Sequence, residues 1–183
     1  MGEGYSNSGK CMKRRSGTEE SFINLNRDFF TRDVLEVAPD LIGKILIVGP
    51  DGHRKRSFGI TEVEAYRGRE DRACHASKGR TRRTEIMFHE GGRIYVYFVY
   101  GMYWMLNIVT GKENDPQAVL IRGVEGITGP GRVTRELGID GSYYGEDLAF
   151  SGRIRIADTG IKATYITKPR VGIDYAGEPW KSK

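Results

Sequence analysis

The stretch Tyr95-Val-Tyr-Phe-Val-Tyr-Gly-Met-Tyr-Trp104 places six aromatic residues in ten positions, and four of the six are tyrosines. A buried strand has little use for so many hydroxyl groups, because each one must reach water or a hydrogen-bond partner. Rings with polar tips suit a surface that stacks on planar groups, and for a basic chain the expected planar group is a nucleobase. The alternative is a tyrosine-rich core strand with its hydroxyl groups at the rim.

Alternation of apolar and polar residues continues on both sides of this stretch and is typical of strands. It predicts strands at residues 45–48, 58–66, 93–100, 103–110 and 118–125, with further short strands after residue 154. One helix is predicted at residues 34–42, capped by Thr31 or Asp33 and containing Pro39. Another begins after Gly129-Pro-Gly and ends at Gly138. Many strands and few helices indicate an α+β fold with a mainly antiparallel sheet and peripheral helices.

The length and charge of the chain indicate how many domains it forms and what it could bind. It has 183 residues with 29 basic and 24 acidic side chains, a net charge of +5. This length is enough to bury one sizeable core, and the modest positive charge permits binding to a polyanion without proving it. We predict a single domain over residues 21–183. Residues 1–20 are rich in glycine, serine and basic residues, so we predict a disordered basic arm there.

Cysteine spacing and hydropathy limit the location of the protein. Cys11 and Cys74 form neither a disulfide framework nor a zinc-ligand spacing. No apolar run approaches the ~18 residues of a spanning helix, and the N-terminus lacks the apolar segment of a signal peptide. We expect no membrane association. The expected location is the cytoplasm, with the nucleoid, in a prokaryote, or the nucleus in a eukaryote.

Two acidic residues stand out in Phe58-Gly-Ile-Thr-Glu-Val-Glu-Ala-Tyr66. In a strand, Glu62, Glu64 and Tyr66 share one face. Two neighbouring carboxylates repel each other on a half-buried surface, and such a loss of stability often marks a functional site. The alternative is a strand end at which both acids face water. Whether Glu62 lies beside Glu64 or turns away through a local twist stays open.

A charged loop follows this strand. It contains His75 and then four cations in six residues, Lys78, Arg80, Arg82 and Arg83. Such a loop is most often a solvated surface, but beside an aromatic strand it also suits contact with phosphates. The familiar phosphate-loop, dinucleotide, zinc-protease and serine-hydrolase motifs are missing from the sequence.

Several short sequence blocks, taken in their order along the chain, form a specific pattern. They are Glu-Val-Glu64-Ala-Tyr66, Ala73-Cys-His75, Met87-Phe88, Tyr95-Val-Tyr97-Phe-Val-Tyr100-Gly-Met-Tyr103, Leu106-Asn107 and Val119-Leu-Ile-Arg122. In this order they resemble the alkyladenine (3-methyladenine, or methylpurine) DNA glycosylase family, and the likeness extends from about Leu25 to Glu178.

The resemblance implies an activity and a partner. It implies a curved sheet with a protruding β-hairpin that intercalates into DNA, in a single DNA glycosylase domain that acts as a monomer. The substrate is duplex DNA with damaged purines, of the class of 3-methyladenine, 7-methylguanine, hypoxanthine and ethenoadenine. Such an enzyme flips the purine out of the helix and hydrolyses its N-glycosidic bond, which initiates base excision repair. No cofactor and no metal are expected, and no strand cleavage.

The resemblance also implies roles for particular residues. Glu64 activates the attacking water as general base, and Arg122 orients the water and the carboxylate, with the arginine expected to offset the effect of burial on Glu64.

Substrate binding is implied for the aromatic blocks. The purine lies between Tyr66 and Tyr97, His75 contacts it from the pocket wall, and Asn107 blocks the exocyclic amine of guanine.

Three hairpin residues are implied to contact the DNA. Tyr100 fills the space that the flipped base leaves, and Met102 and Tyr103 lie against the minor groove.

Two other functions fit the residues. A metal-dependent nuclease would use Glu62, Glu64, Glu70 and Asp71 as oxygen ligands. A binding protein without catalysis would sense damaged DNA through stacking alone.

Overall fold

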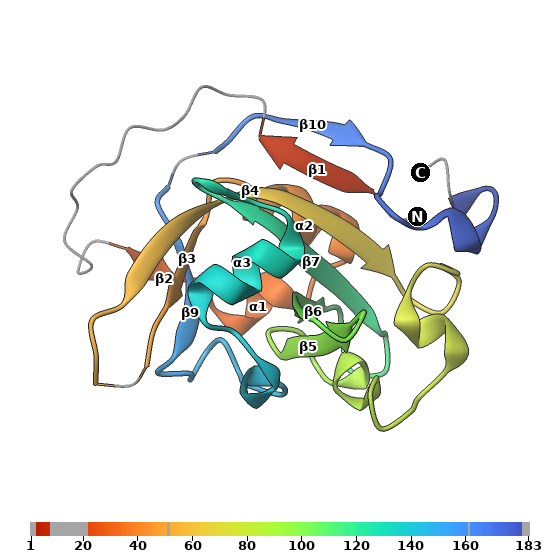
Figure 1. Cartoon of the computed structure of the whole chain (residues 1–183), viewed down its shortest axis with the longest axis horizontal. Helices are drawn as coiled ribbons and strands as arrows, with labels where there is room; N and C mark the ends of the chain where they lie inside the picture. Colours follow the sequence, from red (N-terminus) through yellow and green to blue (C-terminus); the bar gives the residue numbers. More distant parts are fainter. Residues whose placement is uncertain (1–2, 8–21, 51, 161, 181–183) are drawn as a thin grey trace.

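Antiparallel strands form most of the structure, a computed structural model that describes residues 3–7, 22–50, 52–160 and 162–180 (Figure 1). The strands are β1 Gly4–Asn7, β2 Ile23–Asn24, β3 Ile45–Val48, β4 Arg56–Arg67, β5 Ile94–Val99, β6 Tyr103–Thr110, β7 Gln117–Val124, β8 Ile127–Thr128, β9 Ile154–Asp158 and β10 Tyr165–Lys168. The α-helices are α1 Arg27–Phe30, α2 Val34–Leu41 and α3 Pro130–Leu137. Short 3₁₀ helices cover His75–Lys78, Glu85–Phe88, Gly141–Tyr143 and Asp174–Ala176. The predicted class, a mainly antiparallel sheet with few helices, is confirmed.

Strand β4 is the centre of the sheet. The strand order is β2-β9-β3-β4-β7-β6-β5, and every pair is antiparallel. On one edge β4 pairs first with β3 and then, further along, with β1; on the other edge it pairs with β7. Figure 1 shows this long strand arching across the upper part of the view. The curved sheet therefore passes from β3 to β7 through a strand that carries both Glu62 and Glu64.

Both long helices lie where the sequence predicts, with small differences in their bounds: α3 begins at Pro130, inside the Gly129-Pro-Gly segment, and α2 ends at Leu41, one residue early. Asp33 caps α2, because its carboxylate accepts a hydrogen bond from the Leu35 amide, and the chain leaves the helix just before Gly43 at φ +83°. Thr31, the other candidate cap, instead ends α1. Helix α3 starts with Pro130 in its first turn and ends at Gly138, whose φ is +71°.

The aromatic stretch is divided by the alternation of β5. Ile94 and Val96 point into the main core, which α2 and α3 cover. Tyr95 and Tyr97 point to the other side of the strand, into a second cluster that includes Met87. One face of β5 therefore stabilises the fold, and the tyrosines are left for a pocket.

The N-terminal segment differs from its prediction. Residues 1–20 were expected to be a disordered arm, but Gly4–Asn7 form strand β1 between β4 and β10. Little in this short polar stretch predicts a strand, because both of its partners lie far away in the sequence. The basic residues of the arm and Cys11 lie outside the described residues. Among the described helices, none is long and apolar enough to cross a lipid bilayer.

Candidate active site

A bulge in the sheet brings two carboxylates to one arginine. In the β4–β7 register, Glu62 pairs with Gly123 and Val63 with Ile121, so Arg122 is an extra residue without a partner. Such a bulge turns a side chain away from the regular alternation. The Arg122 Nε donates to Oε1 of Glu62 at 3.0 Å, and its Nη1 lies 3.3 Å from Oε1 of Glu64. The open question about Glu62 is therefore answered, since both acids reach the same guanidinium.

Glu64 is buried, and both of its carboxylate oxygens have partners. Its side chain is 2% exposed. The Val171 amide donates to Oε1 at 2.8 Å, and the Tyr66 hydroxyl donates to Oε2 at 2.8 Å. Burial raises the pKa of Glu64 above its usual value, while Arg122, the Val171 amide and Tyr66 act in the opposite direction and offset burial only in part. The site therefore holds a carboxylate that is a stronger base than a solvated one.

A second, fully buried ion pair supports this arrangement. Arg170 donates to the two carboxylate oxygens of Asp71 at 2.5 and 3.0 Å, and to the Ala65 carbonyl at 3.2 Å. Its guanidinium lies 4.8 Å from the centre of the Tyr66 ring. Arg170 directly precedes Val171, so this pair fixes both the ring and the amide that contact Glu64.

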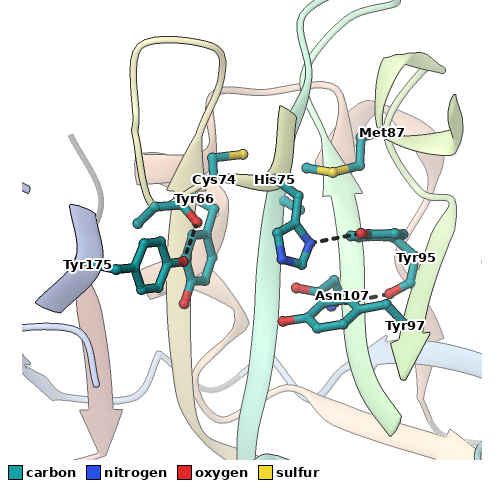
Figure 2. Close-up of a pocket in the computed structure, with 10 residues that line it drawn as sticks. Tyr66, Cys74, His75, Met87, Tyr95, Tyr97, Asn107 and Tyr175 are labelled. Atoms are coloured by element: carbon teal, nitrogen blue, oxygen red, sulfur yellow. Dashed lines mark hydrogen bonds between the residues drawn. The ribbon is translucent and has the colours of Figure 1, made fainter. Parts of the chain in front are cut away.

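Next to Glu64 lies a pocket with aromatic walls (Figure 2). Figure 2 shows Tyr66 and Tyr175 on one side of it and His75, Tyr95 and Tyr97 on the other. Its other lining residues are Ala73, Cys74, Met87, Asn107 and Ala118. The pocket has the flat aromatic sides that a planar ligand requires.

His75 is neutral at pH 7. Burial, followed by the nearby Arg83 and Lys78, lowers its pKa to about 4. Its Nδ1 lies 2.8 Å from the Tyr95 hydroxyl, and its Nε2 lies 3.4 Å from Nη2 of Arg83. A guanidinium only donates hydrogen bonds, so Nε2 is the acceptor and Nδ1 carries the proton. The imidazole is thus held in one tautomer at the pocket wall, and its ring centre lies 4.6 Å from that of Tyr97.

Asn107 lies deeper in the same pocket. Its Nδ2 donates to the backbone carbonyls of Tyr95 and Met105, each at 3.2 Å. Both donor hydrogens are used by the sheet, so the orientation of this buried amide is fixed.

An exposed hairpin ends the aromatic stretch. Residues 100–102 join β5 to β6, and the Met102 amide donates to the Val99 carbonyl at 3.2 Å across a turn. The two central residues of that turn, Tyr100 and Gly101, have φ of +54° and +67°, as a type I′ turn requires. Tyr100 is 83% exposed and Met102 is 62% exposed. Tyr103, by contrast, lies with its ring against Gly131 at the start of α3, where a Cβ atom would be only 2.7 Å from the ring. The tip therefore offers Tyr100 and Met102 to solvent, with Tyr103 half-buried below them.

The predicted residues fall into two groups. Glu64, Arg122 and Tyr66 are in contact, and Tyr66, His75, Tyr97 and Asn107 line one pocket. The hairpin residues form a separate group at the tip. Sequence reasoning missed several contributors, namely Asp71 as partner of Arg170, and Val171 and Tyr175. The only sequence signal for Arg170, Val171 and Tyr175 was the family likeness that extends through residues 170–178.

The acids of the metal-site alternative are not gathered. Asp71 is bound to Arg170, and Glu70 is exposed. Across the ranges that the structure covers, no three His, Cys, Asp or Glu side chains are grouped as metal ligands.

A carboxylate activated by burial, beside a slot for a flat aromatic group, is suited to hydrolysis next to a bound base. This arrangement fits the N-glycosylases, the hydrolases that separate a base from its sugar. The profile of the family described as Methylpurine-DNA glycosylase (MPG) matches residues 28–128 and 125–182. The chain therefore belongs to the methylpurine-DNA glycosylase family.

Individual relatives agree with the family profile. A Rickettsia felis protein named for 3-methyladenine DNA glycosylase activity is 44% identical over 158 residues, covering 82% of this chain and 86% of that protein. A similarly named Methanocella arvoryzae protein is 40% identical over 181 residues, covering 86% and 90%. One from Legionella pneumophila is 44% identical over 163 residues, covering 84% and 88%.

Proposed function

We propose that this protein is a monofunctional DNA glycosylase that removes damaged purines from duplex DNA. Its substrates are of the class of 3-methyladenine, 7-methylguanine, hypoxanthine and ethenoadenine. The observation that carries the proposal is the buried Glu64, bound to Arg122 at 3.3 Å and to Tyr66 of the aromatic pocket at 2.8 Å. The product, an abasic site, initiates base excision repair.

Access to the glycosidic bond requires that the purine leave the stack. Flipping a base costs a few kcal/mol, and less for a damaged or mismatched base. Tyr100, at the exposed tip of the hairpin, fills the vacated space, with Met102 beside it in the minor groove. The positive φ of Tyr100 supports this role, because a bulky residue in that conformation is strained and strain is often kept at functional sites.

Within the pocket, the flipped purine lies between Tyr66 and Tyr97. A methylated purine carries positive charge, which strengthens stacking on electron-rich rings by about 0.5–2 kcal/mol. This gain is small against the excess of normal bases, so exclusion must add to it. Asn107, whose amide the sheet holds in place, opposes the exocyclic amine of guanine, the one donor of normal base pairs in the minor groove.

Hydrolysis uses water as the nucleophile. Glu64 accepts a proton from the water as its oxygen bonds to the sugar carbon, and the electrons of the broken glycosidic bond leave with the base. The carboxylate also stabilises the positive charge that develops on the sugar, and Arg122 orients it. Strand cleavage would need an amine nucleophile. The described residues that line the pocket include no lysine.

The test uses a duplex with one ethenoadenine or one hypoxanthine, incubated with the protein in chelator. Hot alkali then converts abasic sites to breaks. We expect breaks at the lesion only after alkali, and a loss of about 10²–10⁴-fold in the rate with Glu64→Gln. Glu62→Gln is the matched control, because Glu62 contacts the same arginine but is more exposed, and we expect less than about a tenfold loss.

The rival functions give different results. A metal-dependent nuclease breaks the strand without alkali and stops in chelator. A binding protein retains the damaged duplex and releases no base. Base release by Glu64→Gln at the original rate would show that the role given to Glu64 is wrong.

A further inference from the structure

Strand β1 lies beside the proposed catalytic residue but outside the part of the chain that matches the family profile, which begins at residue 28. Gly4 pairs with Glu64 on β4 and with Lys168 on β10. Figure 1 shows β1 and β10 side by side, next to β4. This strand therefore adds a segment to the edge of the active site that the family profile does not include.

The contact between β1 and Glu64 is close. A Cβ atom on Gly4 would lie 3.8 Å from Cγ of Glu64 and 3.0 Å from the Lys168 carbonyl oxygen. The next amide along β4, that of Ala65, donates to the Glu3 carbonyl at 2.7 Å. A side chain at position 4 would therefore press on the β10 backbone at the Lys168 carbonyl and lie in ordinary van der Waals contact with Glu64, so any shift of β10 is passed to the segment that supplies the Val171 amide.

Strand β1 is firmly attached on its other face. The Tyr5 side chain is buried in the main core, and its ring packs edge-on against Tyr165 of β10 at 5.4 Å between centres. Its hydroxyl donates to the Glu3 carboxylate at 2.6 Å. The burial of an aromatic ring is a large apolar gain, so β1 is held as part of the sheet and does not merely lie on it.

Strand β1 also connects the site to the C-terminal segment. In the described sheet, β10 pairs with β1 alone. Two residues beyond β10 comes Arg170, and then Val171, whose amide donates to Glu64. Without β1, β10 loses its strand partner and the Val171 amide loses part of its support.

We propose that Glu3–Asn7 form a positioning strand for Glu64, which fixes the carboxylate from the edge of β4 and through the β10 segment that supplies the Val171 amide. This inference rests on the proposed role of Glu64. Gly4 is then a positioning residue, since it touches neither the base nor the water. A displacement of the carboxylate by about 1 Å is enough to slow the chemical step about 10²-fold.

The test is a graded series in the full chain, Gly4→Ala and Gly4→Val, assayed on an ethenoadenine duplex under single-turnover conditions. We expect the rate at saturating enzyme to fall about tenfold with alanine and about 10²-fold with valine. The half-saturating enzyme concentration should change less than about threefold, because the pocket walls and the hairpin are untouched. Opening the site to water should also move the acid limb of the rate profile to lower pH, because burial is the main cause of the raised pKa of Glu64.

Two reference variants make the result decisive. Leu25→Ala removes core packing beside β9, a strand that does not pair with β4 in the described sheet, and is assayed below its melting temperature as the stability control. If it reproduces the rate loss and the pH shift, or if both Gly4 variants match the parent protein, the positioning role is wrong. Should valine prevent folding, the alanine variant decides in the same way. Glu64→Gln separates the two claims: retained activity there defeats the proposed function itself, whatever the Gly4 variants do.

Discussion

The hydroxyl of Tyr66 donates a 2.8 Å hydrogen bond to Oε2 of Glu64, so a wall of the aromatic pocket is joined directly to the buried carboxylate. This bond lowers the pKa of Glu64 against the effect of burial. Tyr66→Phe keeps the ring for stacking but removes the bond, so the pKa of Glu64 should rise. We expect the acid limb of the single-turnover rate profile to move to higher pH.

Tyr97→Phe is the matched control for that experiment. It also keeps a ring of the pocket, but no hydrogen bond joins Tyr97 to Glu64 among the described contacts. Its acid limb should stay in place. An equal shift in both variants would mean that the polarity of the pocket, and not the bond to Tyr66, sets the pKa of Glu64.

Stability and activity should change in opposite directions at the hairpin tip. Tyr100 adopts φ +54°, a conformation that costs a bulky residue roughly 1–2 kcal/mol and that asparagine tolerates better. Tyr100→Asn creates an Asn-Gly turn, which favours the type I′ geometry. We expect Tm to rise by roughly 2–4 °C, for a gain of about 1 kcal/mol. Base release from duplex DNA should fall about tenfold or more, because the wedge is lost.

Substrates whose damaged base is already unpaired test whether Tyr100→Asn slows base release because the wedge is lost. If Tyr100 acts as a wedge, the loss should shrink for a lesion opposite a gap or in a mismatch, where extrusion is less costly. Calorimetry that shows no gain in Tm would contradict the strain at Tyr100. An undiminished rate on duplex DNA would contradict its intercalation.

Local sequence patterns were sufficient to predict many of the strands and helices. The alternation in residues 103–110 matches β6, and the Gly-Pro-Gly start and Gly138 stop match α3. These signals lie within a few residues of the element that they specify. Strand β1 has no such signal, because it is held by pairing with β4 and β10, whose residues lie about sixty and a hundred and sixty positions further along.

The same distinction separates the two halves of the site. Glu64 and Tyr66 lie two positions apart in the sequence, and a strand places such a pair on one face. The Val171 amide lies 107 positions from Glu64 in the sequence, and Tyr175 comes from a short 3₁₀ helix near the end of the described chain. A backbone donor leaves no trace in residue type, so only the folded chain shows that Val171 belongs to the site. The roles of the individual residues in catalysis and binding stay predictions.

The neutral state of His75 predicts an unusual titration. Its pKa of about 4 lies below the usual 6.5, first because of burial and then because of Arg83 and Lys78. NMR titration should therefore show one of the three histidines titrating near pH 4. Arg83→Gln should raise that pKa, whereas Arg80→Gln, which removes a cation bound to Glu85, should leave it unchanged.

The same shift makes stability depend on pH with a definite sign. Between about pH 6.5 and pH 4 the unfolded chain binds a proton at His75 that the folded chain does not bind. The free energy of unfolding should thus decrease as the pH falls through this window, by about 3 kcal/mol from this group. Urea denaturation at a series of pH values, on the parent protein and on His75→Gln, measures this pH dependence. If the free energy of unfolding changed equally with pH in the two proteins, the low pKa of His75 would be contradicted.

The buried pair of Asp71 and Arg170 should behave as one unit. Both side chains are fully buried, so removing one partner leaves the other charge without compensation. We expect Asp71→Asn to lower the free energy of unfolding by about 3–5 kcal/mol, as measured by urea denaturation. Arg170→Met should cause a similar loss, and in addition slow base release, because Arg170 also packs on Tyr66 and precedes Val171. The double variant should lose less than the sum of the two single losses by about 2 kcal/mol, since no buried charge then remains. Additive losses would show that each residue contributes through separate contacts, and the pair would then not explain how the segment around Val171 is held against Glu64.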